Sequence, residues 1–300
     1  MGIPLFPDPV ILYEGPDYAV ISKPPGMFSA PLKGRTGGET LLDWYARRFP
    51  LVLGVRGRQP WEGGILHRLD RETAGLILFA KNQETMDALT VQQEECLFTK
   101  DYEALTANEK TLRKLPGFPP PPAVRIVPAT SPIIPLAAEP AVFQEPRCIE
   151  SAFRPYGKGA RAVRPVPWPF PWTPESPPAG KPGNRKRTPA LDRGRPYRTE
   201  INGVVSPCTG FSFPAAMGYY RFHIRIRRGF RHQIRCHLAW IGYPILNDSL
   251  YGGGKAEGYP FVALWARGIA FFDPRSGERR EFILPSVTLP LVKDLKTGVP

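Results

Sequence analysis

The distribution of strand and helix patterns along this chain is compatible with an α+β fold. Several short runs alternate apolar and polar residues, which is typical of strands with one buried face. A few other stretches carry apolar residues three or four positions apart, as amphipathic helices do. With 300 residues, of which 42% are hydrophobic, the chain can bury one sizeable core or two small ones.

Strands and helices are predicted in turn over the first third of the chain. Residues 10–14 and 18–23 form two strands joined by a turn, and a short helix follows over about 40–49. Residues 76–80 are a compact apolar strand, after which Asn82 can cap a helix that ends near Glu95. A further strand is predicted over residues 97–106.

That last strand separates two kinds of side chain. Tyr102 and Ala104 would lie on one face, and Asp101 and Glu103 on the other, because successive side chains of a strand alternate.

Composition changes between about residues 108 and 198, where proline becomes dense. Between Pro116 and Pro196 lie 21 of the chain's 38 prolines. Proline removes backbone donors and blocks helix interiors, so we expect an irregular insertion, partly extended as polyproline II. Its aromatic run at 167–172 and its basic patch at 181–187 could contact RNA, or the segment could be a plain linker whose aromatic residues pack on the domain.

Residues 219–228 show the clearest alternation in the chain. The apolar face carries Tyr220, Phe222, Ile224 and Ile226, and the other face carries Arg221, His223, Arg225 and Arg227. A helix is predicted from about His232, which would place Arg231 and Arg235 one turn apart on the same side. These arginines could form a phosphate-binding surface, and the alternative is a solvated charged face.

The overall charge points to a polyanionic partner. Lys and Arg exceed Asp and Glu by 40 to 27, which gives a formal net charge of +13 and a pI of about 9.8. Nucleic acid and an anionic membrane both fit this sign, but no basic amphipathic helix or lipidation signal supports a membrane. No stretch approaches the ~20 apolar residues of a membrane span, and residues 1–9 do not resemble a secretory signal.

The cysteines and histidines do not indicate a metal site. The four cysteines lie far apart without a Cys-x-x-Cys pair, which favours a reducing cytoplasm. His232 and His237 are spaced so that their rings leave a helix on different sides, and no acidic ligand accompanies them. We therefore expect no metal.

Asp70 lies in a polar turn with an arginine close on each side. Neighbouring guanidinium groups and partial burial favour the ionised form of a carboxylate, which is how a reactive carboxylate can be held. An ordinary turn or a surface ion pair would show the same local pattern.

The surrounding motif resembles a known family. The run His-Arg-Leu-Asp-Arg-Glu-Thr-Ala-Gly at residues 67–75 is similar to the His-Arg-Leu-Asp-x-x-Thr-Ser-Gly signature of RluA-like (RluA/RluD-type) RNA pseudouridine synthases. Residues 100–104 and 229–252 resemble the second and third motifs of that family, in the same order. Weaker matches occur at 23–26 and 264–274. The resemblance covers about two thirds of the chain and omits the proline-rich insertion.

The resemblance implies specific catalytic roles. Asp70 would be the catalytic carboxylate, Tyr102 would stack on the target base and assist proton removal, and Arg235 would form the ion pair that fixes Asp70. Residues expected to contact RNA are Arg68, His67, Arg225, Arg227, Arg231 and His232. The sequence departs from the family pattern at Ala74, Phe230, Trp265 and Asp273, which puts the identity of the substrate in doubt.

The implied reaction isomerises uridine in structured RNA, either rRNA or tRNA, to pseudouridine. The base is detached from the ribose, rotated and rejoined through carbon, so no metal, redox cofactor or ATP is required. The implied architecture is a single α+β domain around a long, mostly antiparallel sheet with a central basic cleft, interrupted by the insertion. We expect a cytoplasmic monomer without a separate N-terminal RNA-binding module.

Two alternatives remain open at this point. One is a catalytically inactive RNA-binding protein with the same fold. The other is a nucleoside or sugar hydrolase that uses Asp70, although a glycosidase normally needs a second carboxylate and none is evident in the sequence.

Overall fold

The computed structural model describes residues 8–32, 38–107, 115, 117–122, 125–126, 147–168, 194–205, 219–256 and 259–285. The strands are β1 (Val10–Glu14), β2 (Tyr18–Lys23), β3 (Ala74–Ala80), β4 (Thr99–Ala107), β5 (Arg125–Ile126), β6 (Arg147–Tyr156), β7 (Ala162–Pro167), β8 (Tyr197–Val205), β9 (Tyr219–Ile226), β10 (Leu264–Phe272) and β11 (Arg279–Ile283). The helices are α1 (Leu41–Ala46), α2 (Gln83–Glu94) and α3 (Gln233–Trp240). None of these helices is long and apolar enough to cross a membrane.

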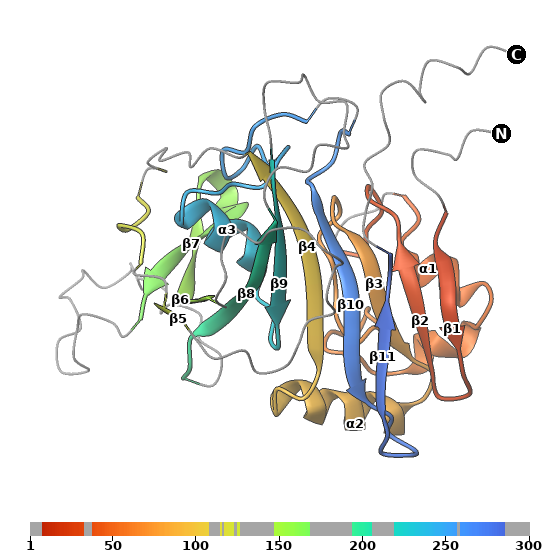
Figure 1. Cartoon of the computed structure of the whole chain (residues 1–300). Helices are drawn as coiled ribbons and strands as arrows, with labels where there is room; N and C mark the ends of the chain where they lie inside the picture. The colour runs from red at the N-terminus through yellow and green to blue at the C-terminus, as the bar shows by residue number, and fades with distance from the viewer. Residues whose placement is uncertain are drawn as a thin grey trace, which may run out of the picture.

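The strands of the described residues form one long sheet. Its order is β1-β2-β3-β10-β4-β9-β8-β6-β5, with β11 beside β10 and β7 beside β6. Every pair is antiparallel except β3 with β10, which is parallel. Figure 1 shows β10 and β4 in the middle, with the N-terminal strands on one side and the strands of the insertion on the other. The predicted α+β fold around a long, mostly antiparallel sheet is confirmed.

The elements with strong local sequence signals form where they were predicted. β1 and β2 match the two expected strands, and β3, β4 and β9 lie within two residues of the expected bounds. Thr40 caps α1 through a capping box with Asp43, and the Asn82 side chain accepts a hydrogen bond from the Thr85 N–H at the start of α2.

Burial of β3 on both faces explains its continuous apolar sequence. Ile77 and Phe79 pack in the cluster that contains the α1 side chains, whereas Leu76 and Leu78 pack with the α2 side chains. At the start of the same strand, Gly75 pairs with Ala266 of β10. This parallel pairing joins the N-terminal strands to the centre of the sheet, immediately after the Asp70 turn.

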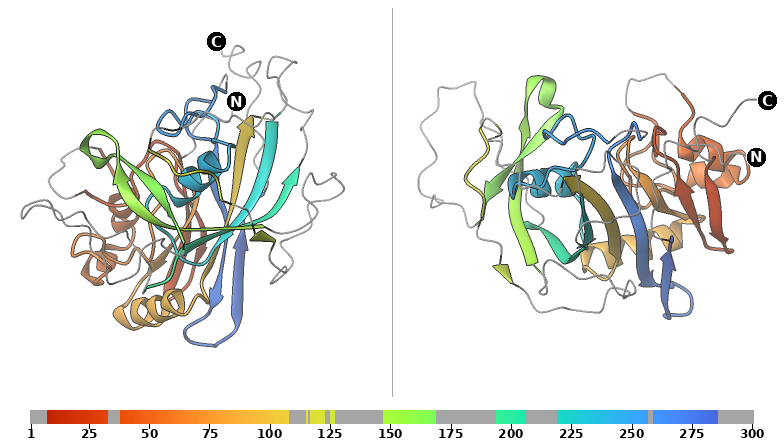
Figure 2. Two further views of the ribbon diagram at one scale, coloured as in Figure 1. Left: turned by 90° about the vertical axis from the view of Figure 1, so that its left-hand side faces the viewer. Right: turned by 45° about the horizontal axis from the view of Figure 1, so that its top comes forward.

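The insertion is more regular than predicted. Residues 147–167 form the hairpin of β6 and β7, which Figure 2 shows at the end of the sheet far from β1 and next to α3. The prolines are tolerated because β7 pairs only with β6, and because Pro155 lies beyond the part of β6 that pairs with β8. The basic patch at 181–187, and the aromatic run after Trp168, lie outside the described residues.

We expect Gly75→Ala to destabilise the protein much more than Gly277→Ala. Both glycines have positive φ, +122° and +70°, which strains an alanine at either position. At Gly75 the added β-carbon would also lie 2.2 Å from the carbonyl oxygen of Ala266, whereas at Gly277 it would meet nothing within 4 Å. Denaturant unfolding of both variants tests this, and equal midpoints would contradict it.

Candidate active site

Hydrogen bonds to the segment that follows β2 hold the Asp70 turn in place. The Ser29 hydroxyl accepts a hydrogen bond from the Leu69 N–H at 3.1 Å and donates one to the Leu69 carbonyl at 3.0 Å. Gly26 donates its N–H to the Arg71 carbonyl at 2.8 Å. The backbone on both sides of Asp70 is therefore tied to a part of the chain at least 40 residues away.

Lys23 reinforces the same junction from within the core. Its buried ammonium donates to the carbonyls of Pro24, Met27 and Arg71 at 2.9, 2.8 and 3.3 Å. Burial lowers the pKa of Lys23 to about 7, although the negative charge of Asp70 acts in the opposite direction. Lys23 thus joins two backbone segments close to the carboxylate.

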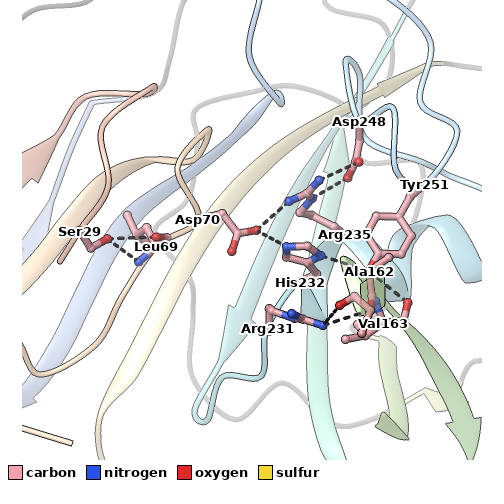
Figure 3. A network of polar contacts seen from close by, with 11 residues as sticks. Ser29, Leu69, Asp70, Ala162, Val163, Arg231, His232, Arg235, Asp248 and Tyr251 are labelled. Carbon is pink, nitrogen blue, oxygen red and sulfur yellow. Dashed lines mark hydrogen bonds and ion pairs between the residues drawn. The ribbon is translucent and has the colours of Figure 1, made fainter. Parts of the chain in front are cut away.

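Asp70 makes its principal contact with a guanidinium 165 positions downstream. Arg235 Nη1 lies 2.8 Å from Asp70 Oδ2, and Arg235 also donates from Nε and Nη2 to Asp248 at 2.7 and 2.9 Å (Figure 3). Burial alone would lower the pKa of Arg235, but the hydrogen bonds and charges of Asp248 and Asp70 outweigh it and raise that pKa. Because Asp248 is fully buried, it fixes the direction of the arginine from behind.

His232 is a second neighbour of Asp70, and it connects the site to the insertion. Its Nε2 lies 3.6 Å from Asp70 Oδ2, and its Nδ1 lies 3.3 Å from the Tyr251 hydroxyl. That hydroxyl accepts from the Val163 N–H at 2.9 Å and donates to the Val163 carbonyl at 3.1 Å. Burial lowers the pKa of His232, so its ring is mainly neutral at pH 7.

Tyr102 is buried on β4, and its electrostatic environment includes Asp70. Burial is the main cause that raises the pKa of Tyr102, and the charges of Asp70 and Asp101 add to it. The phenol is therefore protonated at neutral pH. The structure thus brings together Asp70, Tyr102, and the pair Arg235 and His232 from three separate parts of the chain.

The arginines of β9 do not form the predicted phosphate-binding surface. Arg225 is 4% exposed and donates from Nε and Nη2 to both oxygens of Asp101, at 2.7 and 2.8 Å. Arg221 and Arg267 both contact Glu103, at 3.2 and 3.0 Å. The acids come from β4, a neighbouring strand, so the alternation within residues 219–228 could not reveal them.

These ion pairs also lie on the opposite side of the sheet from Tyr102. Asp101 is opposite Arg225 in the antiparallel register, and Tyr102 is opposite Ile224. Because side chains alternate along a strand, Arg225 and Tyr102 project to different faces. Arg225 is therefore engaged in an ion pair within the sheet, and its expected role in RNA binding stays a prediction that this geometry does not favour.

The other residues expected to bind RNA have different surroundings. Arg227 lies 3.5 Å from Glu200, and Arg231 precedes α3 and donates to the carbonyls of Ala160 and Ala162. The prediction that Arg231 lies one helical turn before Arg235 is therefore wrong, because Arg231 precedes the helix. Arg68 remains about half exposed and pairs with Glu62 at 2.8 Å. His67 is close to Asp70 in sequence, but its ring nitrogens are buried.

The histidine on the other side of α3 is structural. His237 is fully buried, and its Nε2 lies 2.8 Å from the Ser151 hydroxyl while its Nδ1 lies 2.8 Å from the Thr199 hydroxyl. Burial lowers the pKa of His237 to about 3. In the described part of the chain, no group of three His, Cys, Asp or Glu side chains could hold a metal ion.

Three departures from the family pattern have structural partners in this chain. Phe230 stacks on Phe153 of the insertion hairpin, with ring centroids 5.0 Å apart. Asp273 accepts a hydrogen bond from the Tyr18 hydroxyl at 2.8 Å, and Trp265 packs beside Tyr259. The Phe230 contact indicates that this substitution accompanies the packing of the insertion against α3.

The sequence reasoning assigned no role to Lys23, Asp248 or Tyr251. Asp248 and Tyr251 lie within the third motif, and Lys23 within the weaker N-terminal match, so the resemblance contained the signal. Their contacts depend on the folded chain and could not be derived from spacing.

Comparisons with known proteins agree on one family. Residues 17–240 match the family model described as RNA pseudouridylate synthase. The chain is 28% identical over 277 residues to an uncharacterized RNA pseudouridine synthase of Chloroflexus aurantiacus, covering 92% of this chain and 63% of that protein. It is 26% identical to ribosomal large subunit pseudouridine synthase D of Haemophilus ducreyi, covering 96% of this chain and 70% of that protein.

Among solved structures, human RNA pseudouridylate synthase domain containing 1 superposes with a TM-score of 0.52 at 19% identity, covering 93% of this chain and 83% of that one. This likeness supports the fold. The chain spans less than two thirds of the Chloroflexus relative, at 63% of its length.

We expect Asp101→Ala to destabilise the protein by about 3–5 kcal/mol, because it leaves the buried Arg225 without its counter-charge. The double variant Asp101→Ala/Arg225→Met should cost less than the sum of the two single changes. Urea unfolding of all three variants measures this coupling. A folded Arg225→Met variant could instead show a plot of log K for RNA against log salt that is less steep by about 0.9. Arg225 would then contact a phosphate, and the assignment of Arg225 to a purely structural ion pair would be wrong.

Proposed function

Because the chain belongs to the RNA pseudouridylate synthase family, we propose that it isomerises specific uridines in structured RNA, either rRNA or tRNA, with Asp70 as the catalytic carboxylate. The observation that carries this assignment is the position of Asp70. Its side chain is 28% exposed and contacts Arg235, which is itself held by the buried Asp248. A carboxylate held in this way is available to a substrate without being free to rotate away from it.

The two oxygens of Asp70 have different surroundings. Both Arg235 and His232 approach Oδ2, and none of the hydrogen bonds made by described residues goes to Oδ1. We therefore assign Oδ1 to the ribose. It either attacks the anomeric carbon or removes a proton from the sugar, and in both cases positive charge that develops on the ribose is stabilised by the carboxylate.

The reaction balances without any added group. The bond between the base nitrogen and the ribose breaks, the uracil rotates, and a ring carbon forms the new bond to the ribose. That carbon then loses its proton, while the released nitrogen gains one. A second carboxylate to protonate a departing base is unnecessary, because the uracil stays in the site and is the next nucleophile.

Tyr102 fits the role of a platform for the extruded base. Its ring is buried beside Asp70, and an aromatic ring can stack on a uracil face. Because its pKa is raised, the phenol is a poor base in its resting form. It assists proton removal as a relay, accepting the proton of the ring carbon while its own proton passes to the released nitrogen of the uracil.

Extrusion of the target nucleotide costs a few kcal/mol, which favours uridines in loops or other unpaired sites. Arg68 is suited to occupy the vacated position in the RNA. It is about half exposed, and its only partner in the described residues is Glu62. A guanidinium can stack between bases and contact a phosphate at the same time.

We expect Asp70→Asn to reduce pseudouridine formation by a factor on the order of 10³ or more, while RNA binding is retained. The change removes the charge but keeps the size of the side chain. The reaction is measured by tritium release from RNA labelled at the uracil carbon that forms the new bond to the ribose. A filter-binding titration measures the affinity for RNA. Asp87→Asn, on the exposed side of α2, is the matched control and should leave both unchanged.

Full activity of Asp70→Asn would exclude the proposed role of Asp70. No tritium release from the unaltered protein with a range of RNAs would favour the inactive RNA-binding alternative, and free uracil as the product would favour a hydrolase.

We expect Arg235→Lys to lower kcat by about 10²-fold with little change in RNA affinity. An ammonium cannot contact both oxygens of Asp248 in the arginine geometry and still reach Asp70. Single-turnover kinetics and equilibrium binding on the same RNA separate the two effects. A raised Kd with unchanged kcat would show that Arg235 binds RNA and does not position Asp70.

A further inference from the structure

Lys100 is a buried lysine whose charge is not neutralised by the protein. It is 6% exposed, and within the described residues it forms no hydrogen bond or ion pair with a carboxylate. Its ammonium lies 5.9 Å from the centre of the Phe98 ring. Burial, with the added repulsion of Arg58, lowers the pKa of Lys100 to about 8, so the group is still charged at neutral pH.

Two other lysines show how this chain usually accommodates such a group. Lys23 donates to three backbone carbonyls. Lys81 lies over the Phe49 ring, but it also donates to the Gly15 carbonyl at 3.0 Å and lies 3.5 Å from Glu14. Lys100 has the aromatic neighbour and lacks the acceptors. A buried cation in this state is costly, and an anion bound beside it would offset the cost.

His67 adds an unused donor at the same place. Both nitrogens of its ring are buried and have no hydrogen-bond partner in the described part of the chain. Burial, and then the charge of Lys100, lower the pKa of His67, so its ring is neutral and carries one N–H donor. Two donors of different kinds thus lie close together without acceptors.

This pair lies beside the proposed active site. Lys100 precedes Tyr102 by two residues on β4, so both project to the same face about 7 Å apart. His67 is three residues before Asp70. On the other side, a β-carbon added to Gly229, in the turn that leads to α3, would lie 3.4 Å from Lys100 Nζ. The segments that carry Asp70 and Arg235 therefore both border the Lys100 ammonium.

We propose that Lys100 and His67 form a binding site for a phosphodiester group of the RNA next to the nucleotide that is modified. The Lys100 ammonium neutralises the phosphate, and the His67 N–H donates to one of its oxygens. The exposed Arg58 adds positive charge at the rim. This inference rests on the proposed function, because the backbone of an extruded nucleotide is the anion that must pass beside Tyr102.

Gly229 offers a test that leaves Lys100 itself in place. In Gly229→Asp the new carboxylate can reach the ammonium and compete with a phosphate, whereas Gly229→Asn adds nearly the same volume without charge. Gly229 is exposed and does not require a positive φ, so both variants should fold. Lys100→Met removes the charge directly, and Lys81→Met removes an equal charge from a lysine that already has a carboxylate neighbour.

The probe is a single-stranded oligouridylate, titrated against the full chain at several salt concentrations. The plot of log K against log salt should become less steep by about 0.7 in Gly229→Asp and in Lys100→Met. This change corresponds to the loss of one contact to a single-stranded phosphate. Gly229→Asn and Lys81→Met should keep the slope of the unaltered protein. Equal slopes for Gly229→Asp and Gly229→Asn would overturn the proposal, even if Lys100→Met fails to fold.

Inorganic phosphate distinguishes the source of the anion. If phosphate raises the Tm of the unaltered protein and of Gly229→Asn but not of Gly229→Asp, while the oligouridylate slopes of all three agree, the site binds free phosphate and the assignment to RNA is wrong. These binding measurements need no catalysis. Failure of the proposed function would appear separately, as an absence of tritium release from the unaltered protein.

Discussion

The geometry of the site depends on one guanidinium that two carboxylates share. Asp248, fully buried, takes two donors of Arg235 and leaves a third directed at Asp70. A single arginine cannot neutralise two carboxylates, so the group retains excess negative charge. That excess lies at Asp70, the partner that remains accessible, where a ribose cation would develop. In the proposed mechanism Asp248 therefore acts by holding the arginine, without touching the substrate.

The same strands use their two faces for different purposes. On one side of β4, Tyr102 and Lys100 border the proposed active site, and on the other side Asp101 and Glu103 pair with arginines of β9 and β10. Buried ion pairs of this kind contribute little net stability as intact pairs, but losing one partner is expensive. The net charge of +13 is therefore a poor guide to where RNA binds, since several of the arginines are already neutralised within the sheet.

Sequence reasoning succeeded where the signal was local, as with β1, β2 and the caps Thr40 and Asn82. It failed where neighbours decide the outcome. The arginines of residues 219–228 were predicted to be free for phosphate because the acids that pair with them lie on another strand. The prolines of residues 147–167 were predicted to prevent regular structure because the sequence does not show that a strand lies at the edge of a sheet. The family that the resemblance predicted is confirmed by the family-model match, while the roles of individual residues, the monomeric state and the compartment stay predictions.

The position of β10 constrains how the protein is made. This strand is close to the end of the described chain, yet it is inserted between β3 and β4, which are otherwise separated. A ribosome that has not yet released residues 264–272 holds a chain whose two halves have exposed strand edges and no continuous sheet. Assembly of the Asp70 turn against β4 must therefore wait until β10 has been synthesised, which makes folding dominated by contacts between distant residues and correspondingly slow.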